Sequence, residues 1–232
     1  MQKGKIDLVV LGDATGRNFF NEIYAVYCAG TTCTCDITES DWPNDLVEQL
    51  IDPQGEGVYK VVTKHWVLGY EGFRTKPIFT YSIQRIKGGA KYSPVTRNLV
   101  VGPDFFDVTT EYADYYTAEL LPKVEDAKKA VEGQYKSNED QAEAEAAVQF
   151  AYDDYRRRIL HDTKAGFDNA LKWIGSPYRG VQSLAIRTME EIDDNAAAAK
   201  LKEWSQSKDK GIADQAAPAL SRWVERKAER GR

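Results

Sequence analysis

The sequence predicts an α+β fold, with an N-terminal antiparallel β-sandwich or small barrel followed by a C-terminal α-helical bundle. The chain changes character near Pro103: most glycines and β-branched runs come before it, and Ala, Glu and Lys dominate after it. In addition, apolar positions in the C-terminal part recur after 31 residues, a period typical of stacked helix pairs. We therefore expect a β-rich domain over residues 1–104 and an α-helical domain over residues 105–232.

Five or six strands separated by Gly-rich turns are expected in the first domain. The stretch from Val58 to Leu68 has apolar residues on both faces, which is typical of a central strand covered on both sides. A short helix is expected over 41–51, because Asp41-Trp42-Pro43 places a proline near a first turn. The expected strands are 5–11, 21–27, 31–37, 58–68, 76–86 and 96–101.

The pattern after Pro103 is helical. Thr109 or Thr110 is expected to cap a helix that runs to about Gly133, and Pro122 should break or kink it. The segment 137–140 resembles a capping box, because an acid follows the serine by three residues. The helices expected beyond it are a long one ending near residue 159 and four others at 163–174, 178–192, 196–206 and 212–228.

A repeat is visible within these last helices. Leu171-Lys172 recurs about 30 positions later as Leu201-Lys202. Five further pairs lie 31 positions apart: Gly180 and Gly211, Val181 and Ile212, Ala185 and Ala216, Met189 and Leu220, and Ile192 and Trp223. The stretch from about Ala165 to Val224 resembles HEAT-like helical repeats. That resemblance implies a protein–protein interaction module and names no partner. About two units are visible, whereas roughly three are usually needed for a stable solenoid.

Composition excludes some classes of partner. The net charge is −5 and the isoelectric point is near 5.3, which argues against general nucleic-acid binding because that needs a surplus of Lys and Arg. No run approaches the roughly 20 apolar residues of a membrane span. We expect a cytoplasmic protein that binds neither nucleic acid nor membranes.

The three cysteines, Cys28, Cys33 and Cys35, lie within eight positions. An odd count in one cluster is not a disulfide framework. On a strand, Cys33 and Cys35 share a face. A metal site would need a fourth ligand, and the nearest histidine is His65. Free thiols are the expectation, with no metal and no cofactor.

The most enzyme-like stretch is 6–17, where a strand ends in Gly-Asp. Serine esterases have a nucleophilic serine after such an Asp, and this chain has Ala14 there. The stretch also lacks the Gly-Lys-Ser/Thr end of a phosphate loop. We therefore expect no catalytic residue. If the β domain holds a small-ligand site, its residues would be Asp13, Thr15, Arg17 and His65.

Two groups in the helical half are candidates for binding a partner. The arginines Arg156, Arg157 and Arg158 lie where a helix is expected to end, and cations there complement the negative end of its dipole. Alternatively, they bind the acidic surface of a partner or a phosphate. The adjacent Asp153-Asp154 are expected to be surface acids. The tyrosines Tyr112, Tyr115 and Tyr116 either seal the helical half or form a docking strip, since tyrosine anchors interfaces well.

These features predict a non-enzymatic interaction or assembly protein whose helical surface binds a protein partner or a second copy of the chain. The alternative is an enzyme or small-ligand binder with its site in the N-terminal β domain. A third interpretation is a membrane-active or pore-forming protein, which the acidic balance disfavours.

Overall fold

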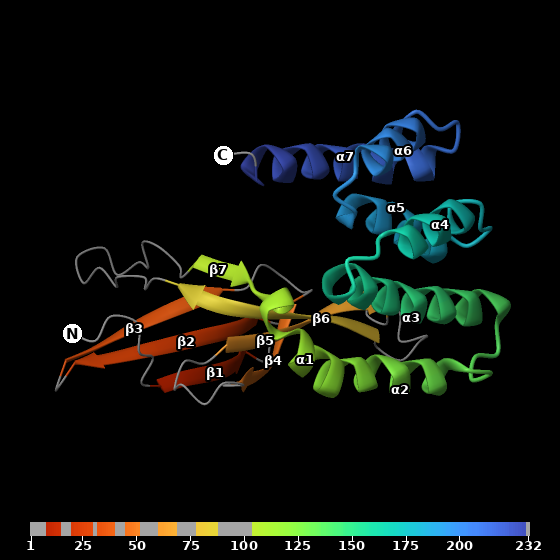
Figure 1. Cartoon of the computed structure of the whole chain (residues 1–232). Coiled ribbons are helices and arrows are strands. Elements are labelled where there is room, and N and C mark those ends of the chain that lie inside the picture. Colours follow the sequence, from red (N-terminus) through yellow and green to blue (C-terminus); the bar gives the residue numbers. More distant parts are fainter. Residues whose placement is uncertain are drawn as a thin grey trace. The chain divides into compact units, whose positions relative to one another are not determined.

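The computed structural model describes residues 8–14, 20–29, 32–39, 45–51, 60–68, 78–87 and 104–230 (Figure 1). Strands come first in these residues and helices follow, so the chain combines α and β structure. The chain divides into two compact units, Met1–Trp66 with Tyr81–Leu120 and Val67–Thr80 with Leu121–Arg232. The domain boundary expected at residue 104 stays a prediction.

The described strands form two sheets, with the orders β1-β2-β3 and β4-β5-β6-β7. The strands are β1 (Leu8–Ala14), β2 (Phe20–Ala29), β3 (Thr32–Glu39), β4 (Asp45–Ile51), β5 (Lys60–Leu68), β6 (Ile78–Lys87) and β7 (Asp104–Asp107). The pairs β1–β2, β2–β3, β4–β5 and β6–β7 are antiparallel. Five of these strands overlap ranges expected from the sequence. The strand expected at 96–101 lies outside the described residues.

The helix expected over 41–51 is wrong where the structure describes it, because Asp45–Ile51 is strand β4. This strand pairs with β5, with Leu50 opposite Val61 and a register shift between Val47 and Gln49. A seven-residue helix is too short to be stable alone, so pairing with a neighbouring strand decides the conformation.

Strand β7 was not expected, and it pairs with β6 just before the first helical turn. The ladder continues at Val108, whose N–H donates to the carbonyl of Ile83 at 2.8 Å. The hydroxyl of Thr109 accepts a hydrogen bond from the Ile83 N–H at 2.9 Å and donates to Asp107 Oδ1 at 2.6 Å. Thr109 therefore ties this turn to β6 and does not cap a helix.

The helix expected up to Gly133 is continuous in the chain, but its α-helical hydrogen bonding is interrupted just before Pro122. It consists of η1 (Thr109–Tyr112), α1 (Ala113–Tyr115), the π-helical turn η2 (Tyr116–Leu120) and α2 (Leu121–Val131). Proline lacks an N–H and its ring clashes with the carbonyl of the residue four positions earlier. The wider turn η2 lies at that place in the chain, and Pro122 falls in the first turn of α2, where proline is tolerated.

The remaining five helices follow the sequence expectations closely. They are α3 (Asn138–Ile159), α4 (Lys164–Trp173), α5 (Arg179–Glu191), α6 (Asn195–Ser205) and α7 (Lys210–Arg230). The cap expected at Ser137 is present, because its Oγ accepts a hydrogen bond from the Asp140 N–H at 3.0 Å. Asp194 caps α6 in the same way through the Ala196 N–H at 2.8 Å. No helix in the described residues is long and apolar enough to cross a membrane.

Helices α2 to α7 pack as successive pairs. Contacts join α2 with α3, α4 with α5 and α6 with α7, while α3, α5 and α7 contact one another in that order. Figure 1 shows these helices as layers that follow the sequence. The buried core of the last four helices consists of Ala170, Ala185, Ile186, Met189, Ile192, Ala197, Leu201, Trp204, Ile212, Ala216, Ala219 and Trp223.

Burial in α4 and α6 can be compared with the spacing expected from the sequence. Leu201 is fully buried, whereas Leu171 is 40% exposed, so these two leucines are not equivalent. The residue that corresponds to Leu201 is Ala170, which is fully buried and lies 31 positions earlier. The buried positions of α4 and α6 are therefore 31 residues apart here, and the repeat itself stays a prediction.

Candidate functional site

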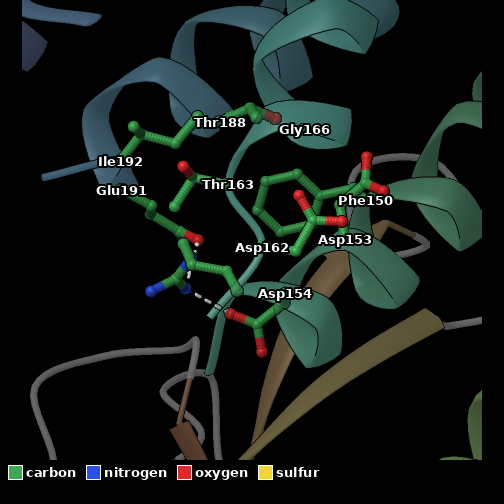
Figure 2. Close-up of a pocket in the computed structure, with 10 residues that line it drawn as sticks. Phe150, Asp153, Asp154, Asp162, Thr163, Gly166, Thr188, Glu191 and Ile192 are labelled. Carbon is green, nitrogen blue, oxygen red and sulfur yellow. Dashed lines mark hydrogen bonds and ion pairs between the residues drawn. The ribbon is translucent and has the colours of Figure 1, made fainter. Parts of the chain in front are cut away.

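Two neighbouring aspartates of α3 are buried close to α4 and α5 (Figure 2). Asp153 Oδ1 accepts a hydrogen bond from Gln149 Nε2 at 2.9 Å, and Asp153 Oδ2 accepts one from Asn169 Nδ2 of α4 at 2.7 Å. Burial raises the pKa of Asp153, and these two hydrogen bonds offset part of that increase. The expectation that Asp153 and Asp154 are surface acids is therefore wrong.

Asp154 accepts hydrogen bonds from two of the arginines that follow it on α3. Arg157 Nη2 donates to Asp154 Oδ1, and Arg158 Nε donates to the same oxygen at 2.9 Å. Arg157 Nη2 also lies 3.1 Å from Glu191 Oε2 at the end of α5, an ion pair drawn with dashes in Figure 2. Arg157 therefore links α3 to α5.

The third arginine, Arg156, pairs with Asp162 in the link between α3 and α4. Asp162 also accepts a hydrogen bond from the Lys164 N–H at 3.0 Å, at the start of α4. Burial works to raise the pKa of Asp162, but the hydrogen bonds from Arg156 and Lys164 outweigh it and the pKa is lowered. His161, between the two helices, has a φ of 53°, so the chain reverses through a left-handed residue there.

The cavity among these groups is too small for a substrate. Its free volume is about 10 Å³, which is room for about one water molecule. The three arginines bind acids of their own chain, and two of the pairs join separate helices or the link between them. This cluster therefore braces α3 against α4 and α5. Whether the arginines also bind a partner stays a prediction.

A larger and open groove lies between α3 and the connection from α4 to α5. Its volume is about 420 Å³. Half-buried Trp173 and Tyr178 contribute aromatic surface, and exposed Lys172 contributes a positive charge. The groove is lined by Ala142, Glu145, Ala146, Gln149, Lys172, Trp173, Ser176, Tyr178 and Val181. Aromatic residues are enriched in surfaces that bind other proteins, where a polar rim surrounds them.

In the β part, His65 belongs to a cluster of hydroxyl groups on β5 and β6. His65 Nε2 lies 2.8 Å from Ser82 Oγ, and Ser82 Oγ lies 2.7 Å from Thr63 Oγ1. Gln84 Nε2 adds a longer contact to Ser82 Oγ at 3.5 Å. Ser82 is only 1% exposed, so the serine and histidine are in contact but the serine is closed to solvent.

The remaining sequence-predicted residues do not form one site in the described structure. Asp13 lies on β1, while Thr15 and Arg17 lie outside the described residues. Tyr112 and Tyr116 are buried. Their neighbour Tyr115 is half-buried. The Nζ of Lys60 lies 5.4 Å from the centre of the Tyr112 ring, a cation–π contact within the β part. A docking role for these tyrosines stays a prediction.

Sequence reasoning missed the contact of Ser82 with His65 and the ion pairs of Asp154. Ser82 gives no local signal, because its partner His65 is 17 positions away and strand pairing alone joins them. Asp154 does carry a signal, since Arg157 and Arg158 follow it by three and four positions, the spacing of ion pairs on one helix face.

No family model matches the chain, and no curated protein or solved structure is significantly similar to it. Within the part of the chain that the structure describes, no group of three or more His, Cys, Asp and Glu side chains could hold a metal ion. The helical surface and the side-chain clusters are therefore the basis for inferring a function.

Proposed function

We propose that this chain is a non-enzymatic interaction or assembly protein, and that its stacked helices form a HEAT-like surface for a protein partner or a second copy. The packing of α2 with α3, α4 with α5 and α6 with α7 supports this proposal. Three pairs are the number that a solenoid usually needs, and α2–α3 supplies a pair that the sequence repeat does not include.

Polar contacts between α5 and α7 also support it. Arg179 Nη1 lies 2.9 Å from Asp209 Oδ1, and Ser183 Oγ donates to Gln215 Oε1 at 2.6 Å. At the other end of the pair, Arg222 binds Glu190 through two hydrogen bonds of 2.7 Å. Contacts along the full length of two helices hold the surface in one shape, which reduces the entropy lost when a partner binds.

The open groove beside α3 is the observation that carries the proposal. Its volume is about 420 Å³, and it combines two aromatic rings with the ends of Lys172 and Glu145. Buried aromatic anchors surrounded by polar groups are the usual arrangement of protein-binding hot spots. The partner would place an apolar side chain in this groove and acidic groups near Lys172.

In this proposal the β part supports the helical surface or adds a second contact. We propose that its strands form a sandwich, since sheets of three and four strands with antiparallel neighbours are the usual components of that architecture.

The test compares two exposed lysines, each in the last turn of its helix. Lys172 and Lys202 are both exposed and lie in the last turns of α4 and α6, but only Lys172 lines the groove. Light scattering on the size-separated protein measures self-association, and affinity capture with the full chain measures partner binding. We expect Lys172→Glu to weaken the association found and Lys202→Glu to leave it unchanged.

Two results would contradict the proposal. One is a protein that stays monomeric at every concentration and captures no partner. The other is an association that both lysine variants leave unchanged, because the groove would then have no part in it.

A second candidate function is supported by the contact between Ser82 and His65. Their separation of 2.8 Å is that of a nucleophile and its general base, which favours an enzyme or small-ligand binder in the β part. The burial of Ser82 opposes it. A serine-reactive fluorophosphonate probe tests it: labelling of the native protein that Ser82→Ala abolishes would support a hydrolase, and absence of labelling would contradict one.

A further inference from the structure

The hairpin of β2 and β3 brings two of the three cysteines opposite each other. In the antiparallel register, Cys28 is the direct partner of Cys33, and Cys35 is the partner of Val26. Directly opposed residues lie on the same face of a sheet, and so do residues two apart on one strand. Cys28, Cys33 and Cys35 therefore share one face of this hairpin, although the sequence relates only the last two.

The spacing of opposed residues suits a disulfide bond. In an antiparallel pair, directly opposed Cα atoms are about 4.5 or 5.5 Å apart, depending on the hydrogen-bonding position. Both distances fall within the roughly 4.4–6.8 Å range of Cα separations across disulfides. Cys35 is opposed by a valine, so the register offers it no such partner on β2.

We propose that Cys28 and Cys33 are a site of reversible oxidation, at which a disulfide bond closes across the β2–β3 hairpin and Cys35 remains a thiol. The oxidant class is a small-molecule disulfide such as oxidised glutathione. This proposal concerns the β part alone and does not depend on the binding surface proposed for the helices.

The reaction is two successive thiol–disulfide exchanges. The thiolate of Cys28 or Cys33 attacks one sulfur of oxidised glutathione, forms a mixed disulfide and releases one glutathione. The second thiolate then attacks the protein sulfur of that mixed disulfide and releases the other glutathione. Two protein thiols lose two electrons and two protons in total, and two glutathione molecules gain them.

The position of the pair favours a switch over a permanent cross-link. Only four residues separate Cys28 from Cys33, so the bond closes a short loop and adds less to stability through chain entropy than a bond across a long loop would. Its consequence is local: it fixes the register at the end of the hairpin. Reduced glutathione reopens the bond by the reverse of these two exchanges, in which two glutathione thiols are oxidised to one glutathione disulfide and both protein thiols are restored.

Differential alkylation of the folded full chain tests the proposal. The protein is equilibrated with oxidised glutathione, its free thiols are blocked with N-ethylmaleimide, and it is then reduced and treated with iodoacetamide. We expect the oxidised chain to be lighter by about 2 Da and to have lost two of its three free thiols. Fragment ions should place N-ethylmaleimide on Cys35 and the second label on Cys28 and Cys33.

Two variants and one denatured sample complete the experiment. Cys35→Ser should keep the loss of about 2 Da, whereas Cys28→Ser should take N-ethylmaleimide on both remaining cysteines. Full unfolding in urea should remove the preference for the Cys28–Cys33 pair, because the strand register no longer sets it. Three N-ethylmaleimide labels on the oxidised chain, a different pairing, or a disulfide-linked dimer would overturn the proposal.

Discussion

The indole Nε1 of Trp223 donates a hydrogen bond to the backbone carbonyl of Ile192 at 2.8 Å. These two residues are also the last corresponding pair of the repeat, 31 positions apart, at the ends of its buried faces. This hydrogen bond therefore joins α7 to the residue that follows α5. Ile192 is the C-cap residue directly after α5, and its carbonyl accepts the hydrogen bond from Trp223 of α7.

Replacing Trp223 with Phe should lower the free energy of unfolding by about 1–3 kcal/mol, because the Ile192 carbonyl loses its indole donor and the smaller ring leaves a void. The helical circular-dichroism signal followed in urea measures the change. The matched control is Val224→Ala on the next, exposed residue, which should change the value by less than about 0.5 kcal/mol. Equal effects of the two changes would contradict the buried contact.

Substitution of Leu171 and Leu201 tests the spacing of the repeat. The sequence pattern pairs these two leucines at a spacing of 30 residues, but only Leu201 is buried. Leu201→Ala should cost about 2–5 kcal/mol, since it empties part of a closed core. Leu171→Ala should cost less than about 0.5 kcal/mol, because that side chain is 40% exposed. Urea titrations of both variants measure these losses in the free energy of unfolding. Similar losses for the two variants would favour a spacing of 30 residues over one of 31.

Asp154→Ala should lower the free energy of unfolding by about 3 kcal/mol, since it leaves two arginines in a largely buried place without their shared acceptor. About a fifth of each arginine side chain is exposed to solvent. The expected decrease in the free energy of unfolding is therefore at the low end of the range for breaking a buried ion pair. The control is Asp168→Ala, which removes the exposed i, i+4 pair with Lys164 and should have little effect. If Asp154→Ala leaves the free energy of unfolding unchanged, the cluster does not brace α3.

The raised pKa of Asp153 predicts a pH dependence with a definite sign. Between the unfolded-state and folded-state pKa values of this carboxyl, the folded protein binds more protons than the unfolded one. The contribution of Asp153 to the free energy of unfolding therefore falls as the pH rises through that window. We expect the wild type to gain stability relative to Asp153→Asn as the pH is lowered from 7 toward about 4.

Urea titrations at several pH values measure this difference, because the other titrating groups are common to both proteins. Asp214→Asn, a change at an exposed aspartate of α7, is the control and should show a weaker trend. A difference between wild type and Asp153→Asn that does not change with pH would contradict a raised pKa at Asp153.

The helical part is where sequence reasoning succeeded. Helices α3 to α7 were expected close to their observed ends, because capping residues such as Ser137 and a 3.6-residue apolar pattern act within a few positions of one another. The interruption just before Pro122 was predictable for the same reason, since proline acts on its own turn.

The tertiary structure alone decided the features that depend on distant partners. Asp45–Ile51 becomes a strand because it pairs with β5, although its own residues allow a helix. Burial of Asp153, contact of His65 with Ser82, and the pairing of Cys28 with Cys33 likewise follow from which elements come together. The sequence by itself determined where helices α3 to α7 begin and end, because caps and periodicity are local. Strand partners and buried polar groups required the fold, because their free energy comes from contacts between residues far apart in the chain.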